Sequence, residues 1–125
     1  MKKIYLASAS LGDRILLKAV ADRLADEHVL YVPMLGFMGI DETAPAFRSQ
    51  VMDIDIRILK EWAEVLVILF EGLASIGIWE EALAMDILHR PVAIFRTRSW
   101  TIPDTAEHFA CFGFMEKIEE WLNGL

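Results

Sequence analysis

Residues 64–70, Glu-Val-Leu-Val-Ile-Leu-Phe, form the most strand-like run of this chain. The run has six consecutive apolar side chains and no polar face, which is typical of a central strand in a sheet that is covered on both sides. Helix-like patterns flank it, over about 49–63 before it and, after a turn at 71–76, to about 89. Strands that alternate with helices of this length predict right-handed crossovers and a parallel sheet.

The same alternation extends in both directions from this central strand. The other expected elements are, in chain order, a strand at 3–7, a helix capped by Asp13 that runs to about 26, a strand at 28–32, a long loop at 34–48, a strand at 91–95 and a last helix from 106 or 114 to 122. We therefore expect one domain over residues 1–125, with an α/β fold. In this fold a small parallel sheet of the flavodoxin or Rossmann-like kind is the middle layer of a three-layer αβα sandwich, and ligands bind outside the carboxyl ends of the strands.

Composition excludes several classes of protein. The chain has 12 Lys and Arg against 19 Asp and Glu, and its net charge of −7 argues against binding of a long nucleic acid. Cys111 is the only cysteine, which excludes an intramolecular disulfide, and no apolar run approaches the ~20 residues that span a membrane. The first residues lack a signal-peptide pattern, so we expect a cytoplasmic protein. The mean hydropathy of +0.38 is high for a small domain and predicts an apolar subunit interface.

One carboxylate lies where the helix at 49–63 is expected to be apolar. When each residue is placed at about 100° per step, Asp55 falls in the centre of the apolar arc, whereas Asp53 falls on the polar face. A carboxylate on the buried side of a helix is costly unless it is paired or hydrogen-bonded. Asp55 therefore has two interpretations: a structural pair or cap with a neighbouring loop, or a carboxylate that faces a ligand.

Three further side chains lie near the expected ligand-binding edge. Glu80 and Glu81 occupy the first turn of a helix, where the helix dipole favours any carboxylate. Glu81 also falls between Met85 and Leu88 on the helical wheel, and a desolvated carboxylate at such an edge is a candidate nucleophile or general acid/base. Tyr5, in the first strand, is either an ordinary core residue or one whose hydroxyl reaches a ligand.

Other cofactor and catalytic motifs are missing from the sequence. His28, His89 and His108 have no metal-ligand spacing with each other or with Cys111, so we expect no metal and no cofactor. Residues 7–12, Ala-Ser-Ala-Ser-Leu-Gly, lack the glycines of a dinucleotide fingerprint, and neither a phosphate-loop lysine motif nor a G-x-S-x-G serine occurs. We reject the nucleotide-fingerprint, zinc and serine-hydrolase functions on these grounds.

Several segments of the chain occur together in one known family. They are the opening Lys-Ile-Tyr-Leu-Ala-Ser at 3–8, the aspartate on the helix before the 64–70 strand, Gly-Leu-Ala-Ser-Ile-Gly-Ile-Trp-Glu-Glu at 72–81 and His-Arg-Pro-Val at 89–92. In this order and spacing the chain resembles the nucleoside 2-deoxyribosyltransferase superfamily over about residues 3–95. The most specific part of the resemblance is the strand followed by S-x-G-x-x-x-E and R-P-V.

The resemblance implies a reaction and assigns roles within it. Members of the superfamily cleave the N-glycosidic bond of deoxynucleosides or nucleotides and pass the sugar to another base or to water. The resemblance implies that Glu81, four residues after Gly77, is the nucleophile, whereas Glu80 would need a one-residue slip. It also implies that Tyr5 positions this glutamate and that Asp55 binds the base or sugar or handles a proton. The substrate-binding residues on the same basis are Ser8, Glu71, Ser75 and Gly77.

The chain departs from the superfamily pattern in the loop after the 64–70 strand. This loop is short and lacks the usual acidic residue, which only Glu71 could replace. Three functions stay open: a transferase or hydrolase acting on a nucleoside or nucleoside 5′-monophosphate, a non-catalytic nucleotide-binding or sensor module of the same fold, and an interaction domain without a small-molecule ligand. We also expect a homo-oligomer, at least a dimer, because members commonly oligomerise and the helix at 78–88 is apolar nearly all round.

Overall fold

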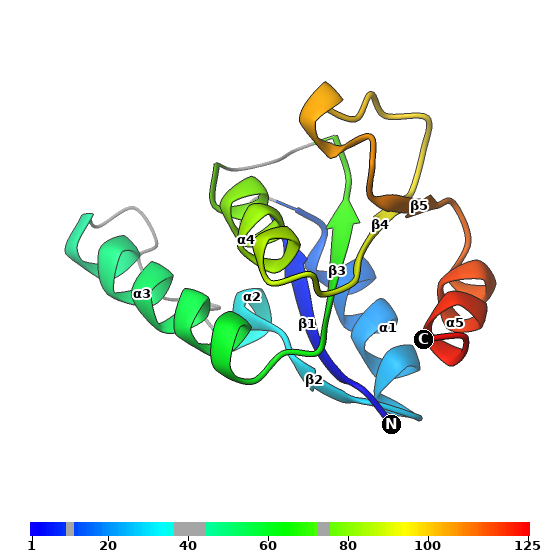
Figure 1. Cartoon of the computed structure of the whole chain (residues 1–125), viewed down its shortest axis with the longest axis horizontal. Coiled ribbons are helices and arrows are strands. Elements are labelled where there is room, and N and C mark those ends of the chain that lie inside the picture. Colours follow the sequence, from blue (N-terminus) through cyan, green and yellow to red (C-terminus); the bar gives the residue numbers. More distant parts are fainter. Residues whose placement is uncertain (10–11, 37–44, 73–75) are drawn as a thin grey trace.

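A five-stranded parallel sheet forms the middle layer of the structure (Figure 1). The computed structural model describes the main chain of residues 1–9, 12–36, 45–72 and 76–125, and the side chains of residues 1–9, 12–35, 53–72 and 77–125. Within these residues the strands are β1 (Lys3–Ser8), β2 (Val29–Tyr31), β3 (Val65–Phe70), β4 (Val92–Arg96) and β5 (Ala110–Phe112), in the spatial order β2-β1-β3-β4-β5.

Helices cover both faces of this sheet and make it a three-layer αβα sandwich, as expected. The helices are α1 (Arg14–Ala25), α2 (Pro33–Gly36), α3 (Pro45–Glu61), α4 (Ile76–Ile87) and α5 (Met115–Asn123), with a 3-10 turn η1 (Asp104–Ala106). Side chains of α1 and α5 pack on one face, and those of α3 and α4 pack on the other. No helix in the described part of the chain is both long and apolar enough to cross a membrane.

Strand β1 shows how one sequence run supplies both cores. Tyr5 and Ala7 pack against the helices α3 and α4, whereas Ile4 and Leu6 pack against α1 and α5. This alternation follows from the period-two geometry of a strand. Because β1 and β3 are the neighbouring central strands, both of their faces are buried, which explains why they read as continuous apolar runs.

The expected four strands are too few, because a fifth strand, β5, pairs with β4 at the edge of the sheet. β5 has three residues, all only partly buried, and such a short run shows no strand pattern in the sequence. It becomes a strand because it pairs with β4. The expected loop at 34–48 is also helical at both ends, in α2 and in the first turn of α3, while residues 37–44 lie outside the described residues. The last helix begins at Met115, which favours the later of its two predicted starts.

Arg90 ties α3 to the sheet. Its guanidinium nitrogen Nη1 donates to the main-chain carbonyls of Leu59, Lys60 and Ala63, at 3.1, 2.7 and 3.1 Å. These carbonyls lie at the carboxyl end of α3, where they lack partners within the helix and where the helix dipole favours a cation. The arginine just before β4 therefore holds the helix that carries Asp55.

Candidate active site

Four polar side chains from four different elements lie together on the α3 and α4 face of the sheet. Tyr5 comes from β1, Tyr31 from β2, Asp55 from α3 and Glu81 from α4. The Tyr31 hydroxyl donates to Asp55 Oδ1 at 2.8 Å, and the ring centroids of Tyr5 and Tyr31 are 5.3 Å apart. Glu81 interacts electrostatically with both Tyr5 and Asp55. The sheet and two helices therefore build one cluster of two carboxylates and two phenols.

The cluster is withdrawn from solvent. Tyr5 is fully buried, Asp55 is 3% exposed and Glu81 is 7% exposed. The helical wheels predict this burial for Asp55 and for Glu81, and both predictions are confirmed, as is the prediction that Asp53 lies on the surface. Glu80 is exposed, so Glu81 is the glutamate that faces the cluster. The expectation that both lie in the first turn of their helix is wrong, because α4 begins at Ile76 and its first turn has no acidic residue.

Burial changes the ionisation of the two carboxyl groups. It raises the pKa of Glu81 to about 8, against a lowering by the nearby Tyr5 hydroxyl and a smaller rise from the charges of Asp55 and Glu80. Burial also raises the pKa of Asp55, and the hydrogen bond from Tyr31 opposes that rise. Two carboxyl groups with raised pKa values in one buried cluster are typical of a site that moves protons or forms a covalent bond.

The two phenols stay protonated across the physiological range. Burial is the largest cause that raises the pKa of each tyrosine; for Tyr5 the next causes are the charges of Glu81 and Asp55, and for Tyr31 the hydrogen bond to Asp55. Yet neither Tyr5 Oη nor Glu81 Oε2 makes a hydrogen bond of good geometry to another described residue, although the Tyr5 hydroxyl is near enough to the Glu81 carboxyl group to lower its pKa. Buried polar atoms without a well-formed hydrogen bond are rare and costly, so two of them in one cluster make this a candidate position for a polar group of a ligand.

The other residues singled out from the sequence lie elsewhere at the carboxyl edge of the sheet. Ser8 is at the end of β1, and its side chain is on the α1 face, opposite to Tyr5. Its hydroxyl is buried and has no hydrogen-bond partner among the described residues. Glu71, just after β3, accepts hydrogen bonds from the main-chain amide of Asp13. Gly77 is in the first turn of α4, and Ser75 lies outside the described residues.

Sequence reasoning missed Tyr31, which is the hydrogen-bond partner of Asp55. Its position could have been noticed, because Tyr31 lies at the carboxyl end of an expected strand and therefore at the expected ligand edge.

Sequence reasoning also missed the contact of Trp100 with Gly72. Gly72 has a φ of 76°, and a Cβ atom there would lie 2.6 Å from the indole ring of Trp100. The segment after β4 therefore closes over the end of β3.

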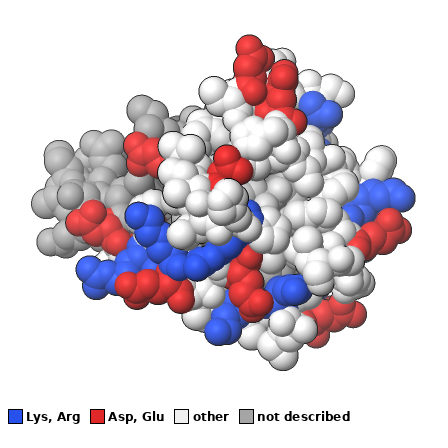
Figure 2. Space-filling model, viewed as in Figure 1, with Lys and Arg blue, Asp and Glu red and all other residues white. Residues whose placement is uncertain are grey.

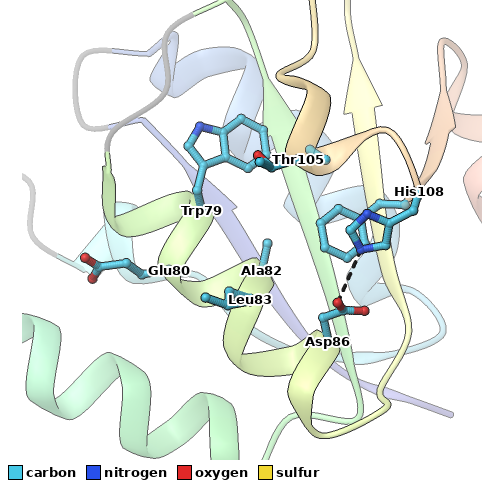
Figure 3. Close-up of a pocket in the computed structure, with 9 residues that line it drawn as sticks. Trp79, Glu80, Ala82, Leu83, Asp86, Thr105 and His108 are labelled. Carbon is cyan, nitrogen blue, oxygen red and sulfur yellow. Dashed lines mark hydrogen bonds and ion pairs between the residues drawn. The ribbon is translucent and has the colours of Figure 1, made fainter.

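A groove of about 380 Å³ lies on the other flank of α4 (Figure 3). Its lining residues are Trp79, Glu80, Ala82, Leu83, Asp86, Thr105, Ala106, His108 and Phe109, so Glu81 is not among them. His108 Nε2 and Asp86 Oδ2 are 3.3 Å apart and join the segment before β5 to α4. This groove is therefore separate from the buried cluster. No group of metal-ligating side chains occurs within the described residues.

Comparison with solved structures gives the fold a name. The chain aligns with the 2-deoxyribosyltransferase of the psychrotolerant bacterium Bacillus psychrosaccharolyticus with a TM-score of 0.72 and 23% identity, over 94% of this chain and 90% of that one. It aligns with a 2-deoxyribosyltransferase of Leishmania mexicana with a TM-score of 0.65 and 12% identity, over 98% of this chain and 97% of that one. The chain has a 2-deoxyribosyltransferase-like fold. No family model and no curated protein sequence matches it significantly.

The 2-deoxyribosyltransferase-like fold explains why the cluster forms where it does. Its parallel sheet reverses strand order between β1 and β3, and such a switch point opens a crevice at the carboxyl ends of the strands. Tyr5 is on β1, which borders this point, Tyr31 is on β2, the edge strand next to β1, and Asp55 and Glu81 are on the helices that cover them. The fold resemblance deduced from the sequence motifs is thus confirmed over nearly the whole chain.

Proposed function

We propose that this protein transfers the sugar of a nucleoside or nucleoside 5′-monophosphate by cleaving its N-glycosidic bond, with Glu81 as the nucleophile. The observation that carries the proposal is the buried pair of Glu81 and Tyr5, in which Glu81 Oε2 and Tyr5 Oη lack a hydrogen bond of good geometry within the described residues. The shared fold supports it, since the similar solved proteins are 2-deoxyribosyltransferases.

The reaction proceeds in two displacements. A carboxylate oxygen of Glu81 forms a bond to the anomeric carbon while the bond from that carbon to the base nitrogen breaks, and the base leaves with the electron pair. A carboxylate suits this step because it stabilises an oxocarbenium-like sugar and then holds it as an ester. An acceptor base or a water molecule next attacks the same carbon, loses its proton and releases Glu81 as a carboxylate.

Asp55 and the two tyrosines prepare this carboxylate. Asp55 is the carboxyl group that exchanges a proton with the base, and burial raises its pKa from the usual value of an aspartate. Tyr31 orients Asp55 through its hydrogen bond. Tyr5 acts on Glu81 as a positioning residue, because its hydroxyl favours the ionised carboxylate and thereby lowers the pKa of that group. Ser8, Glu71, Ser75 and Gly77 remain the proposed substrate-binding residues of the surrounding edge.

The test is incubation of the purified protein with the four 2′-deoxynucleosides and their 5′-monophosphates, with and without a free acceptor base, followed by chromatography. We expect base exchange or base release that Glu81→Gln abolishes. Glu80→Gln is the matched control, since Glu80 is the exposed neighbour on the same helix. Activity that survives in Glu81→Gln would overturn the assignment of the nucleophile.

A non-catalytic nucleotide-binding module is the second candidate. One observation favours it: residues 72–75, Gly-Leu-Ala-Ser, contain no acidic side chain to assist the sugar or the leaving base. Calorimetry separates the two candidates. Binding of a nucleoside or nucleotide without any turnover would favour the sensor module, whereas turnover would exclude it.

We also propose that the exposed face of α4 binds a second copy of this chain. Leu83 and Ile87, one turn apart on this face, are 57% and 68% exposed, and Leu83 also borders the apolar groove. Figure 2 shows an uncharged area near the middle of the same view, whereas basic and acidic side chains together lie across its lower part. A self-complementary apolar stripe fits a two-fold dimer.

Light scattering after size exclusion tests this interface. We expect a dimer or larger assembly for the natural chain and a monomer for Ile87→Lys. Ile15→Lys is the matched control, because Ile15 is an 85% exposed isoleucine of α1, on the other face of the sheet. A monomeric natural chain at micromolar concentration would refute the interface.

A further inference from the structure

The amino-terminal end of α1 is the place where this fold would hold a phosphate. The strand order β2-β1-β3-β4-β5 puts the switch point between β1 and β3, and α1 is the helix that follows β1. In doubly wound sheets of this order a phosphate group binds at the switch point, on the free amides of a helix amino terminus. Whether those amides are available therefore decides whether the site accepts a phosphorylated sugar.

Four main-chain amides of this turn already donate to acceptors within the chain. The amide of Gly12 donates to the carbonyl of Ala9 at 3.0 Å, and the amides of Ile15 and Leu16 donate to the side chain of Asp13 at 2.9 and 3.1 Å. The amide of Asp13 itself donates to both carboxylate oxygens of Glu71, at 3.3 and 3.2 Å. Four amides of this turn therefore have acceptors within the chain, and two of those acceptors are carboxylate groups.

Glu71 reaches this turn because of its position and because of Gly12. It follows β3 by one residue, and Ser8 pairs with Leu69, so Ser8, Leu69 and Glu71 lie on the same face of the sheet. A Cβ atom on Gly12 would lie only 2.5 Å from Glu71 Oε2, so any other residue at this position would push the carboxylate away. The arginine of the turn, Arg14, donates to the carbonyl of Met34 in α2.

We propose that Glu71 determines substrate specificity by occupying the phosphate position, so that the protein accepts uncharged nucleosides and rejects their 5′-monophosphates. The inference rests on the proposed function, since it concerns which substrate reaches Glu81. A phosphate monoester carries nearly two negative charges at neutral pH and would meet the carboxylates of Glu71 and Asp13, while the four amides named above already have acceptors. A sugar hydroxyl, by contrast, can donate to a carboxylate, and the buried Ser8 hydroxyl on the same face has no partner among the described residues.

The experiment compares kcat/KM for each 2′-deoxynucleoside with kcat/KM for its 5′-monophosphate, in the natural chain and in Glu71→Gln. Glutamine keeps the shape and an acceptor for the Asp13 amide but removes the charge. We expect the natural chain to prefer the nucleoside by a factor on the order of 100, and Glu71→Gln to reduce this preference about tenfold. High salt should reduce the preference of the natural chain more than that of the variant, because it screens charge repulsion.

Glu64→Gln is the matched control. Glu64 precedes β3, and its carboxylate also accepts from a main-chain amide, that of Lys3 at 3.2 Å, but at the opposite edge of the sheet. The variant Glu64→Gln removes one negative charge and one similar contact. We expect this variant to prefer nucleosides as strongly as the natural chain does. A loss of preference in Glu64→Gln as large as that in Glu71→Gln would overturn the local role of Glu71.

The outcomes separate this inference from the proposed function. Turnover of monophosphates as efficient as that of nucleosides would overturn the specificity role of Glu71 and leave the glycosyl transfer standing. If no substrate is turned over, calorimetry with the same compounds decides: tighter binding of nucleosides, with the gap reduced in Glu71→Gln, supports the role of Glu71 while the reaction fails. Absence of all binding would refute both.

Discussion

Replacement of Glu81 by glutamine should stabilise the protein, and increasingly so as the pH rises. Burial raises the pKa of Glu81 from 4.5 to about 8 in the folded state. Between these two pH values the folded chain keeps a proton that the unfolded chain has lost, so the free energy of unfolding falls as the pH rises through this window. Glutamine resembles the protonated carboxyl group and does not titrate. The variant should therefore match the natural chain near pH 4.5 and exceed it above pH 8.

The size of the difference follows from the pKa shift. A rise from 4.5 to about 8 corresponds to a maximum of about 5 kcal/mol, at about 1.4 kcal/mol per pH unit. Local relaxation and entry of water around the ionised carboxylate reduce this value, so we expect about 2–5 kcal/mol at pH 9. Tyr5→Phe provides a second test: because the Tyr5 hydroxyl lowers the pKa of Glu81, its removal should extend the pH-dependent window upward.

Urea denaturation at intervals from pH 4.5 to 9 measures this difference. The exposed Glu61, at the end of α3, supplies the control Glu61→Gln, which removes one negative charge without touching the cluster. Its stability should follow the pH profile of the natural chain. If the stability gain of Glu81→Gln were the same at pH 5 and pH 9, Glu81 would not be a buried carboxyl with a raised pKa, and the reasoning would be wrong.

Three other perturbations test different parts of the structure. The kcat/KM for glycosyl transfer should rise about tenfold per pH unit below pH 8 and level off above it, because only ionised Glu81 is nucleophilic. Asp55→Asn should move the midpoint of this profile to lower pH, since the Asp55 charge raises the pKa of Glu81. A flat pH profile would contradict the mechanism. Arg90→Ala should lower the free energy of unfolding by about 2 kcal/mol in urea denaturation, because three carbonyls at the end of α3 lose their donor, and an unchanged midpoint would show that these contacts contribute little. Gly72→Ala should cost about 1–3 kcal/mol, since its φ of 76° is strained for alanine and the new Cβ would collide with the Trp100 ring; a melting temperature equal to that of the natural chain would refute this geometry.

Much of the candidate site follows from local pattern. Asp55 lies in the centre of an apolar arc, and Glu81 lies between apolar residues on its own helix, so helical geometry alone predicts that both are buried. The spacing of four residues after Gly77, which the resemblance to the superfamily requires, selects Glu81 over Glu80, and the exposure of Glu80 agrees with that choice. These predictions succeed because the face of a helix is set by residues within two turns of each other.

Contacts between distant segments could not be deduced in the same way. The hydrogen bond from Tyr31 to Asp55 joins residues 24 positions apart, and the contact of Glu71 with the Asp13 amide joins residues 58 positions apart. The short strand β5 is a similar case, since its three partly buried residues form a strand only through their pairing with β4. Such contacts depend on how strands are ordered and registered, which no single segment encodes.

The sequence by itself determined the alternation of strands and helices, the parallel αβα architecture and the burial of two carboxylates, because each follows from the spacing of apolar residues along one segment. Only the tertiary structure decided that two tyrosines from neighbouring strands join these carboxylates, and that Glu71 turns to the amino terminus of α1. The strand order brings together side chains that are remote in the chain, and their shared burial then sets their ionisation.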